Sequence, residues 1–290
     1  MNKQLPIVAA IINGVLVGSA LVATRFAIDQ TTPSMLALLR YVIGLACLLL
    51  PASLAGRPRF APRDLAPMAL LGVAQFGVVV GLLNYALQFI PSARAALLFA
   101  TFPLLTMLIA ALAGYERMTL VKTAGTLVAI GGVALALGDK ALSGGGSGGW
   151  AGEIAALLSA LTGAICSVLY RLYLRKYKTV SVSAYAMAAA VFFLAVMAAL
   201  DGSLGAGWLV FTPGAWGAVL FIGVNSGIGY YLWLWALSRA AATNVTVFLT
   251  LSPVTAAVLG ALLLAEPLPL ATVAGIMAVV GGLVLALRRK

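Results

Sequence analysis

Long apolar segments follow one another along nearly the whole chain of 290 residues. A hydrocarbon core about 30 Å thick is crossed by a helix of about 20 apolar residues. The segments of about this length are 5–25, 34–55, 65–88, 92–113, 120–138, 150–172, 182–201, 213–236, 241–264 and 270–287. The connections between them are short, so the sequence predicts an all-α membrane protein with ten transmembrane helices.

The composition excludes several classes of protein. Hydrophobic residues make up 63% of the chain and charged residues 9%, with a mean hydropathy of +1.11. Soluble domains have about 45–50% apolar and about 25% charged residues. A soluble enzyme, a disordered chain and a nucleic-acid-binding protein are therefore excluded, and we expect membrane lipid, with no nucleic acid, as the surroundings of the chain.

The net charge of +11 predicts the orientation in the membrane. With the N-terminus inside, most of the Lys and Arg residues fall on the inner side, and most of the acids fall outside. Basic residues concentrate in the cytoplasmic loops of membrane proteins. We therefore expect both termini to be cytoplasmic. The first apolar segment lacks the basic leader and the cleavage site of a signal peptide and is expected to be a retained helix.

The chain also repeats itself at an offset of 150 residues. The matched positions are Pro103 and Pro253, Glu116 and Glu266, Gly125 and Gly275, and Gly131-Gly132 and Gly281-Gly282. We expect a first five-helix repeat over 1–138, a Gly/Ser-rich linker over 139–149 and a second five-helix repeat over 150–290.

An odd number of helices in each copy has a geometric consequence. The second copy must enter the membrane from the opposite side, so the two copies form an inverted repeat. Inverted repeats are typical of secondary transporters that work by alternating access, with the substrate near the midplane of the bilayer. One chain supplies both halves, so we expect a monomer.

The duplicated segments resemble a known family. Each half carries an apolar helix with a Pro, then a Glu in a short turn, then a Gly-rich last helix: Phe-Pro-Leu-Leu-Thr, Tyr-Glu-Arg and Gly125 in the first, and Ser-Pro-Val-Thr, Ala-Glu-Pro and Gly275 in the second. With Pro33 and Arg40 at the second helix, this pattern resembles EamA-type transporters of the drug/metabolite transporter superfamily, and most of all the bacterial aromatic amino-acid exporters. The resemblance implies a multi-pass protein of the bacterial inner membrane, and for Arg40 a structural role near the outer mouth. One departure is Val17-Gly18, where the family commonly has Trp-Gly.

Polar and aromatic side chains inside the segments are candidates for substrate binding. An unpaired amide in hydrocarbon costs about 2–7 kcal/mol, so such groups should face the interior. Amides and hydroxyls can bind the carboxylate and ammonium of an amino acid, and aromatic rings its side chain. The alternatives are contacts between helices and aromatic anchoring at the membrane interface. The candidates are Gln75, Asn84, Tyr85, Phe99, Thr101, Ser159, Tyr170, Asn225, Tyr230, Tyr231 and Asn244.

Pro103 and Pro253 occupy matched positions in matched helices. A proline inside a helix removes a hydrogen bond and allows a bend. We expect both to act as hinges for gating, with a static kink as the alternative.

Charged groups bear on the mechanism. The segments carry no central Asp or Glu, and the chain has no His, so a carboxylate proton relay is not expected and facilitated export is favoured over proton antiport. Near the outer helix ends lie Arg25, Arg40 and Arg94. They either extend to the interface, contact a substrate carboxylate or, in the case of Arg25, pair with Asp29. Cys47 and Cys166 form neither a disulfide nor a metal site, so no cofactor is expected.

The function expected from the sequence is the export of amino acids, aromatic or apolar ones included, and related small metabolites. The alternative is a proton-coupled exporter of drugs or quaternary cations, which would be expected to carry a membrane-embedded Glu. An enzyme acting on lipid would need clustered His, Asp or nucleophiles, which the sequence does not offer.

Overall fold

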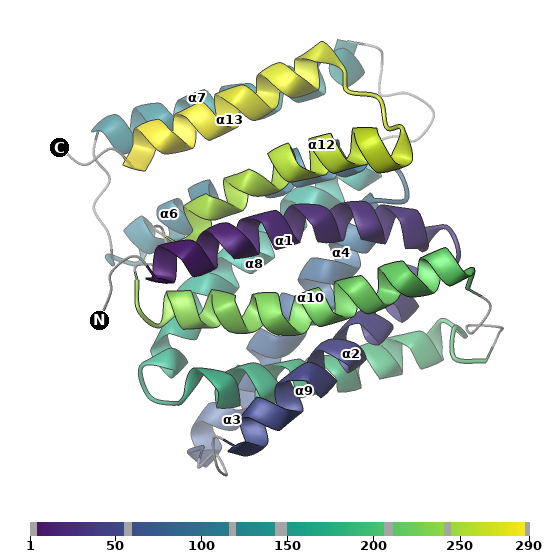
Figure 1. The fold of residues 1–290 in the computed structure, drawn as a ribbon. Coiled ribbons are helices and arrows are strands. Elements are labelled where there is room, and N and C mark those ends of the chain that lie inside the picture. The colour runs from purple at the N-terminus through teal and green to yellow at the C-terminus, as the bar shows by residue number, and fades with distance from the viewer. Residues whose placement is uncertain are drawn as a thin grey trace.

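The computed structural model describes residues 5–54, 60–115, 120–142, 150–205, 211–240 and 245–287. Within these ranges the chain is helical and has no β-strand, and most of the helices lie side by side in one bundle (Figure 1). The elements are α1 (Leu5–Ile28), α2 (Pro33–Leu54), α3 (Pro62–Gly72), η1 (Val73–Val78), α4 (Val79–Ala86), α5 (Ser92–Phe99), α6 (Phe102–Leu112), α7 (Leu120–Leu142), α8 (Ala151–Leu174), α9 (Thr179–Leu200), α10 (Pro213–Leu237), η2 (Val247–Thr250), α12 (Leu251–Leu264) and α13 (Leu270–Leu287).

Many of these helices have the length and composition of membrane spans. Seven described segments, two of them joined from consecutive elements, are long and apolar enough to cross a bilayer, and three further apolar helices are shorter. Prolines begin α2, α3 and α10, where the missing N–H has no helical partner to lose. The all-helical prediction is confirmed, and the helix ends lie within a few residues of the predicted segments.

One boundary differs from the prediction. Helix α7 continues through Leu142, so it includes the first residues of the segment 139–149 that we expected to be a linker. Residues 143–149 lie outside the described residues. The apolar helix-forming pair Ala141-Leu142 extends the helix up to the Gly/Ser run.

Two predicted spans are interrupted. The third is α-helical in α3 and α4 but forms a π-helix over Val73–Val78 between them. The fourth breaks between α5 and α6, where Ala100 N–H donates to the carbonyls of both Ala96 (2.9 Å) and Leu97 (3.1 Å). This tight turn comes just before Pro103, whose ring nitrogen cannot donate to the preceding turn.

The ninth predicted span is also irregular before its proline. A short 3₁₀ helix, η2, leads into α12, and Pro253 lies in the first turn of α12. The Ser252 hydroxyl donates to the Leu249 carbonyl at 2.6 Å, the group that Pro253 leaves without its helical donor. The structure therefore has an irregular turn beside each proline, while the hinge role of Pro103 and Pro253 stays a prediction.

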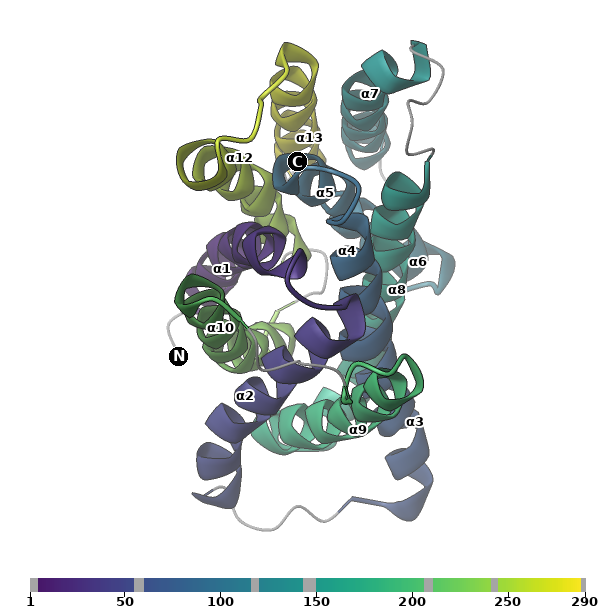
Figure 2. The same cartoon turned by 90° about the vertical axis from the view of Figure 1, so that its right-hand side faces the viewer.

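The packing places the middle of the bundle between segments far apart in the sequence. Helix α1 packs against α10 and α12, and α8 packs against α4 and α6. Figure 2 shows α1 and α10 on one side of the molecule, with α4 and α8 facing them. Helix α2 contacts both α9 and α10, while α7 and α13 lie against each other as a pair at one edge of the bundle (Figure 1).

Glycines bring α7 and α13 close together. A Cβ atom added to Gly132 would lie 2.8 Å from the Gly275 carbonyl oxygen, and one added to Gly282 would lie 2.5 Å from the carbonyl oxygen of Gly125. Distances this short leave no room for a side chain. Of the glycines that match across the repeat, Gly125, Gly132, Gly275 and Gly282 are thus at the points where the two helices touch, as is usual between membrane helices.

Candidate substrate-binding cavity

A cavity lies in the middle of the bundle, between α1, α2, the third span, α5, α10 and η2. The centres of water molecules can occupy about 110 Å³ of it, and a single water needs about 10–15 Å³ by that measure. Its described lining comprises Asn13, Leu16, Val17, Ala20, Leu21, Arg40, Tyr41, Gln75, Phe76, Val79, Val80, Leu83, Phe99, Phe102, Asn225, Ser226, Gly229, Tyr230, Trp233 and Leu249.

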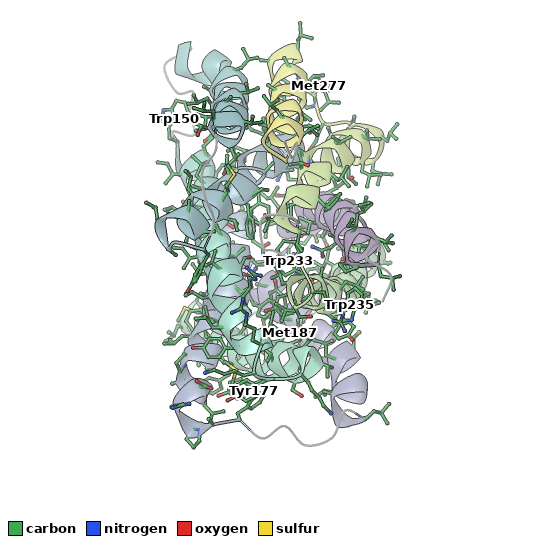
Figure 3. All side chains as sticks on the ribbon, turned by 90° about the vertical axis from the view of Figure 1, so that its left-hand side faces the viewer. Trp150, Tyr177, Met187, Trp233, Trp235 and Met277 are labelled. Carbon is green, nitrogen blue, oxygen red and sulfur yellow. The ribbon has the colours of Figure 1, made fainter. Side chains whose placement is uncertain are left out.

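Aromatic rings supply much of the apolar surface. Phe76 contacts Tyr230 with ring centroids 4.3 Å apart, and Tyr41 with centroids 4.8 Å apart, both edge-on. Phe102 lies 6.0 Å from Trp233 by the same measure, and Figure 3 shows Trp233 near the middle of the bundle. Edge-on pairs of this kind hold rings in fixed orientations, so the apolar wall is preformed.

Amides and one guanidinium supply the polar surface. Asn225 is held by a hydrogen bond from its Nδ2 to the Leu16 carbonyl (2.7 Å). The Gln75 Oε1 atom is buried and has no hydrogen-bond partner in the described chain. The Nε atom of Arg40 donates to the Ser226 hydroxyl, so this side chain turns into the bundle instead of extending along the surface to the interface.

Four of the predicted binding residues line this cavity: Gln75, Phe99, Asn225 and Tyr230. Tyr170 is fully buried just behind, with its ring centroid 6.2 Å from that of Tyr230. The matched pair Gln75 and Asn225 are both in the lining, one from each half of the chain.

The other predicted residues lie elsewhere, and Asn244 falls outside the described residues. Asn84 donates from Nδ2 to the Pro33 carbonyl (3.0 Å), and Ser159 donates to the Val79 carbonyl (2.7 Å), so both connect helices. Thr101 donates to Leu98 O in its own turn (2.7 Å) and borders an apolar groove between α6, α7 and α8. Tyr85 is 40% exposed beside Phe89.

Tyr231 lines a second cavity, of about 520 Å³, where α8 and α10 end and α9 begins. Trp235 lies there too, with the Arg239 guanidinium 4.1 Å from its ring centroid, and Figure 3 shows Trp235 nearer the edge of the bundle than Trp233. This end of the bundle therefore carries a depression that is open to the surroundings. At the same end, Asp64 accepts hydrogen bonds from Tyr177 (2.6 Å) and Lys176 (3.2 Å).

Ion pairs and hydrogen bonds join the helices at the opposite end. The Glu266 carboxylate accepts from the Ser92 backbone N–H, with both oxygens 3.1 Å away, and lies 3.9 Å from Arg25. Arg25 also contacts Asp29 at 3.3 Å, the pairing that the sequence offered as one alternative. Arg94 lies 3.6 Å from Glu153, which connects α5 to α8. The carboxylates of Glu153, which is buried, and Glu266, which is half-buried, thus lie outside the central lining.

Several lining residues were not among the predicted binding residues, namely Asn13, Arg40, Tyr41, Ser226 and Trp233. Helical spacing in the sequence is the signal that could have identified some of these lining residues. Asn13, Leu16, Val17, Ala20 and Leu21 recur at intervals of three and four residues, which places them on one face of α1. Arg40 carried no such signal, because an arginine near a helix end can equally well extend to the interface.

Sequence and structure comparisons identify the family. The model of the EamA-like transporter family matches residues 4–138 and again 150–288. A relative from Streptantibioticus cattleyicolor, described as a "Probable terminal-alkyne amino-acid exporter", is 30% identical over 91% of this chain and 87% of its own length. An uncharacterized transporter of Archaeoglobus fulgidus is 26% identical over 94% of this chain and 95% of its own length. A solved crystal structure matches the fold with a TM-score of 0.74 at 22% identity, over 99% of this chain and 98% of that one. The chain therefore belongs to the EamA-like transporter family.

Proposed function

We propose that this protein exports amino acids, aromatic or apolar ones included, and related small metabolites across the bacterial inner membrane by alternating access. The observation that carries the proposal is the central cavity, which combines Arg40, the amides of Gln75 and Asn225, and a wall of aromatic rings. An amino acid needs hydrogen-bond donors for its carboxylate, acceptors for its ammonium and apolar space for its side chain. The relative described as a "Probable terminal-alkyne amino-acid exporter" supports the same substrate class.

The proposed architecture is ten transmembrane helices in two inverted halves, 1–138 and 150–290, acting as a monomer with both termini cytoplasmic. Two pairs of contacts support it. Helix α1 packs on α10 and α12, and α8, its counterpart in the second copy, packs on α4 and α6. The start of α1 and the end of α13 lie at the same end of the bundle (Figure 1). The duplicated match to the family model supports the same two halves.

The ends of the bundle support alternating access. Ion pairs join the helices at the end that bears Arg25 and Glu266, whereas the end that bears Arg239 has an open surface depression. We propose that the irregular turns beside Pro103 and Pro253 are the points at which the two ends exchange these roles.

The described lining does not support an exporter of quaternary cations. Arg40 is its one charged side chain, and a fixed positive charge repels a cationic substrate.

Transport by the purified protein in liposomes tests the proposal. We expect uptake of labelled phenylalanine, leucine or a related amino acid down its gradient, without acceleration by a pH gradient, because the described cavity lining holds no Asp, Glu or His to carry a proton. Absence of transport for every amino acid in a broad panel would contradict the function, and acceleration by the pH gradient would contradict facilitated export.

A pair of variants tests the location of the site. Replacing Trp233 with alanine should raise the KM for an aromatic substrate by about 10-fold or more, since truncating a buried aromatic contact commonly costs more than 1.4 kcal/mol. Phe192 is 74% exposed on the outside of the bundle, and its alanine variant is the matched control. Equal KM values for the two variants would place binding outside the cavity.

A further inference from the structure

Arg40 has an unusual position for a charged side chain in a membrane helix. It follows Pro33, the first residue of α2, by two turns, which is about 10 Å along the helix axis. Its side chain lines the central cavity and its guanidinium carbon lies 5.6 Å from the centroid of the Tyr41 ring. A charge at this depth is expensive unless it has a partner, so it marks a functional site by default.

The Nε atom of this guanidinium has a hydrogen-bond partner in the described chain, whereas the fork formed by its two terminal nitrogens has none there. Nε donates to the Ser226 hydroxyl, which in turn donates to the Ile222 carbonyl at 2.6 Å. The hydroxyl therefore has a defined direction and holds Nε in place. In the described chain the terminal nitrogens of Arg40 have neither a hydrogen bond nor an ion pair. Such a fork matches a carboxylate, which accepts two parallel hydrogen bonds from it.

Among the described residues, the surroundings of Arg40 offer no anionic partner. No Asp or Glu belongs to the described lining of the cavity. The neighbouring polar groups include neutral amides, among them that of Gln75, whose buried Oε1 accepts no hydrogen bond within the described chain. The described lining thus presents one positive charge, neutral amides and an apolar wall.

Building on the proposed function, we propose that Arg40 binds the carboxylate of the substrate, and that this contact selects the substrate class: carboxylic acids with an apolar or aromatic side chain. In the described lining the ammonium group meets only neutral groups, among them the amides of Asn13, Gln75 and Asn225. It therefore adds little to affinity, and a carboxylic acid without an amino group binds almost as well as the amino acid. An amine without a carboxylate leaves the guanidinium unpaired and is rejected.

Competition on the unmodified protein tests this without a mutation. Uptake of labelled phenylalanine into proteoliposomes is measured against 3-phenylpropionate, phenethylamine and phenylalaninamide, which lack the ammonium, the carboxylate and the carboxylate charge, respectively. We expect 3-phenylpropionate to inhibit within about 5-fold of unlabelled phenylalanine, and the other two to be at least about 10-fold weaker, since a hydrogen bond between charged groups is lost. Inhibition by phenethylamine as strong as that by phenylalanine would overturn the proposal.

Variants of Arg40 provide the second test. R40Q should raise the KM for phenylalanine by about 10- to 100-fold, and R40K by less, because lysine keeps the charge but loses the fork. R175Q, which removes an exposed arginine at the end of α8, is the control and should leave the KM unchanged. An unchanged KM in R40Q would overturn the proposal, and if R40Q does not fold, the competition experiment decides.

Binding measured apart from transport separates the two proposals. Thermal stabilisation of the purified protein by 3-phenylpropionate, lost in R40Q, without transport of any amino acid would contradict the proposed function and retain the assignment of Arg40. Transport of phenylalanine without discrimination against phenethylamine would retain the function and contradict the assignment.

Discussion

Two side-chain amides of the third span have the same chemistry but different surroundings. Gln75 faces the central cavity with a carbonyl oxygen that has no hydrogen-bond partner in the part of the chain that the structure describes, whereas Asn84 is 1% exposed and holds the start of α2 through the Pro33 carbonyl. An amide in an apolar segment signals only that it faces the interior. The sequence predicted this much correctly for both residues, but it could not distinguish a cavity from a contact between helices.

The two amides should respond differently to replacement by alanine. Asn84→Ala removes a buried hydrogen bond and should lower the free energy of unfolding by about 1–3 kcal/mol while leaving the KM unchanged. Gln75→Ala removes no hydrogen bond within the described chain and should change the KM with little loss of stability. Melting temperatures in detergent and transport kinetics of both variants check this, and the reverse pattern would exchange the two roles.

Arg40 shows why the sequence left some residues of the site between alternatives. Arg40 lies near the start of a span, and this position is equally compatible with a side chain at the membrane interface and with one in the interior of the bundle. The distinction depends on Ser226, which lies 186 residues later in the chain, and such a long-range contact has no local signature.

The helices themselves were largely predictable, because the length of an apolar segment and the prolines at its start set the limits of a helix. Interruptions were less so. The turns beside Pro103 and Pro253 follow from the missing N–H of proline, but the π-helix over Val73–Val78 contains no proline and has no comparable signal in its sequence.

The pairing of α7 with α13 depends on Gly132 and Gly282, and each has a neighbouring glycine that serves as a control position. Gly132→Ala and Gly282→Ala would place a Cβ atom within 2.8 and 2.5 Å of a carbonyl oxygen of the partner helix. Each should lower the free energy of unfolding by about 1–3 kcal/mol, as overpacking does.

Gly131→Ala and Gly281→Ala are the matched controls, since a Cβ atom there meets nothing within 4 Å. They should be neutral or slightly stabilising, because alanine favours a helix by up to about 1 kcal/mol over glycine. Thermal unfolding of the four variants is the measurement. Equal losses at adjacent positions would mean that the two helices do not approach each other at these glycines.

On the scale of the whole molecule, the contacts at one end of the bundle should control its closure. Glu266 has a side chain only 10% exposed and joins the loop before α13 to the start of α5. Glu266→Gln keeps the shape but removes the charge. We expect this end to open more often, because a hydrogen bond to a charged group contributes about 1.5–3 kcal/mol.

Labelling measures the opening. In a variant without the two native cysteines, a cysteine introduced at Phe99, in the cavity lining, should react about 10-fold faster with an impermeant maleimide added at this face when Glu266 is replaced. Asp29→Asn breaks an ion pair whose acid is 72% exposed and is the control. Such exposed pairs contribute only about 0.2–1 kcal/mol, so the labelling rate should change little. Equal acceleration by the two variants would show that Glu266 has no special part in closure.

The solitary guanidinium of the cavity has an electrical consequence. Arg40 belongs to the protein, so its charge returns with the empty carrier and adds nothing to the charge moved in a complete cycle. A zwitterionic amino acid then crosses without net current, while a carboxylate that lacks the ammonium carries one negative charge outward. The voltage of a cell with a negative interior drives that movement by about 2.3 kcal/mol per 100 mV. A potassium diffusion potential that makes the interior of proteoliposomes negative should therefore leave phenylalanine efflux unchanged and accelerate the efflux of 3-phenylpropionate.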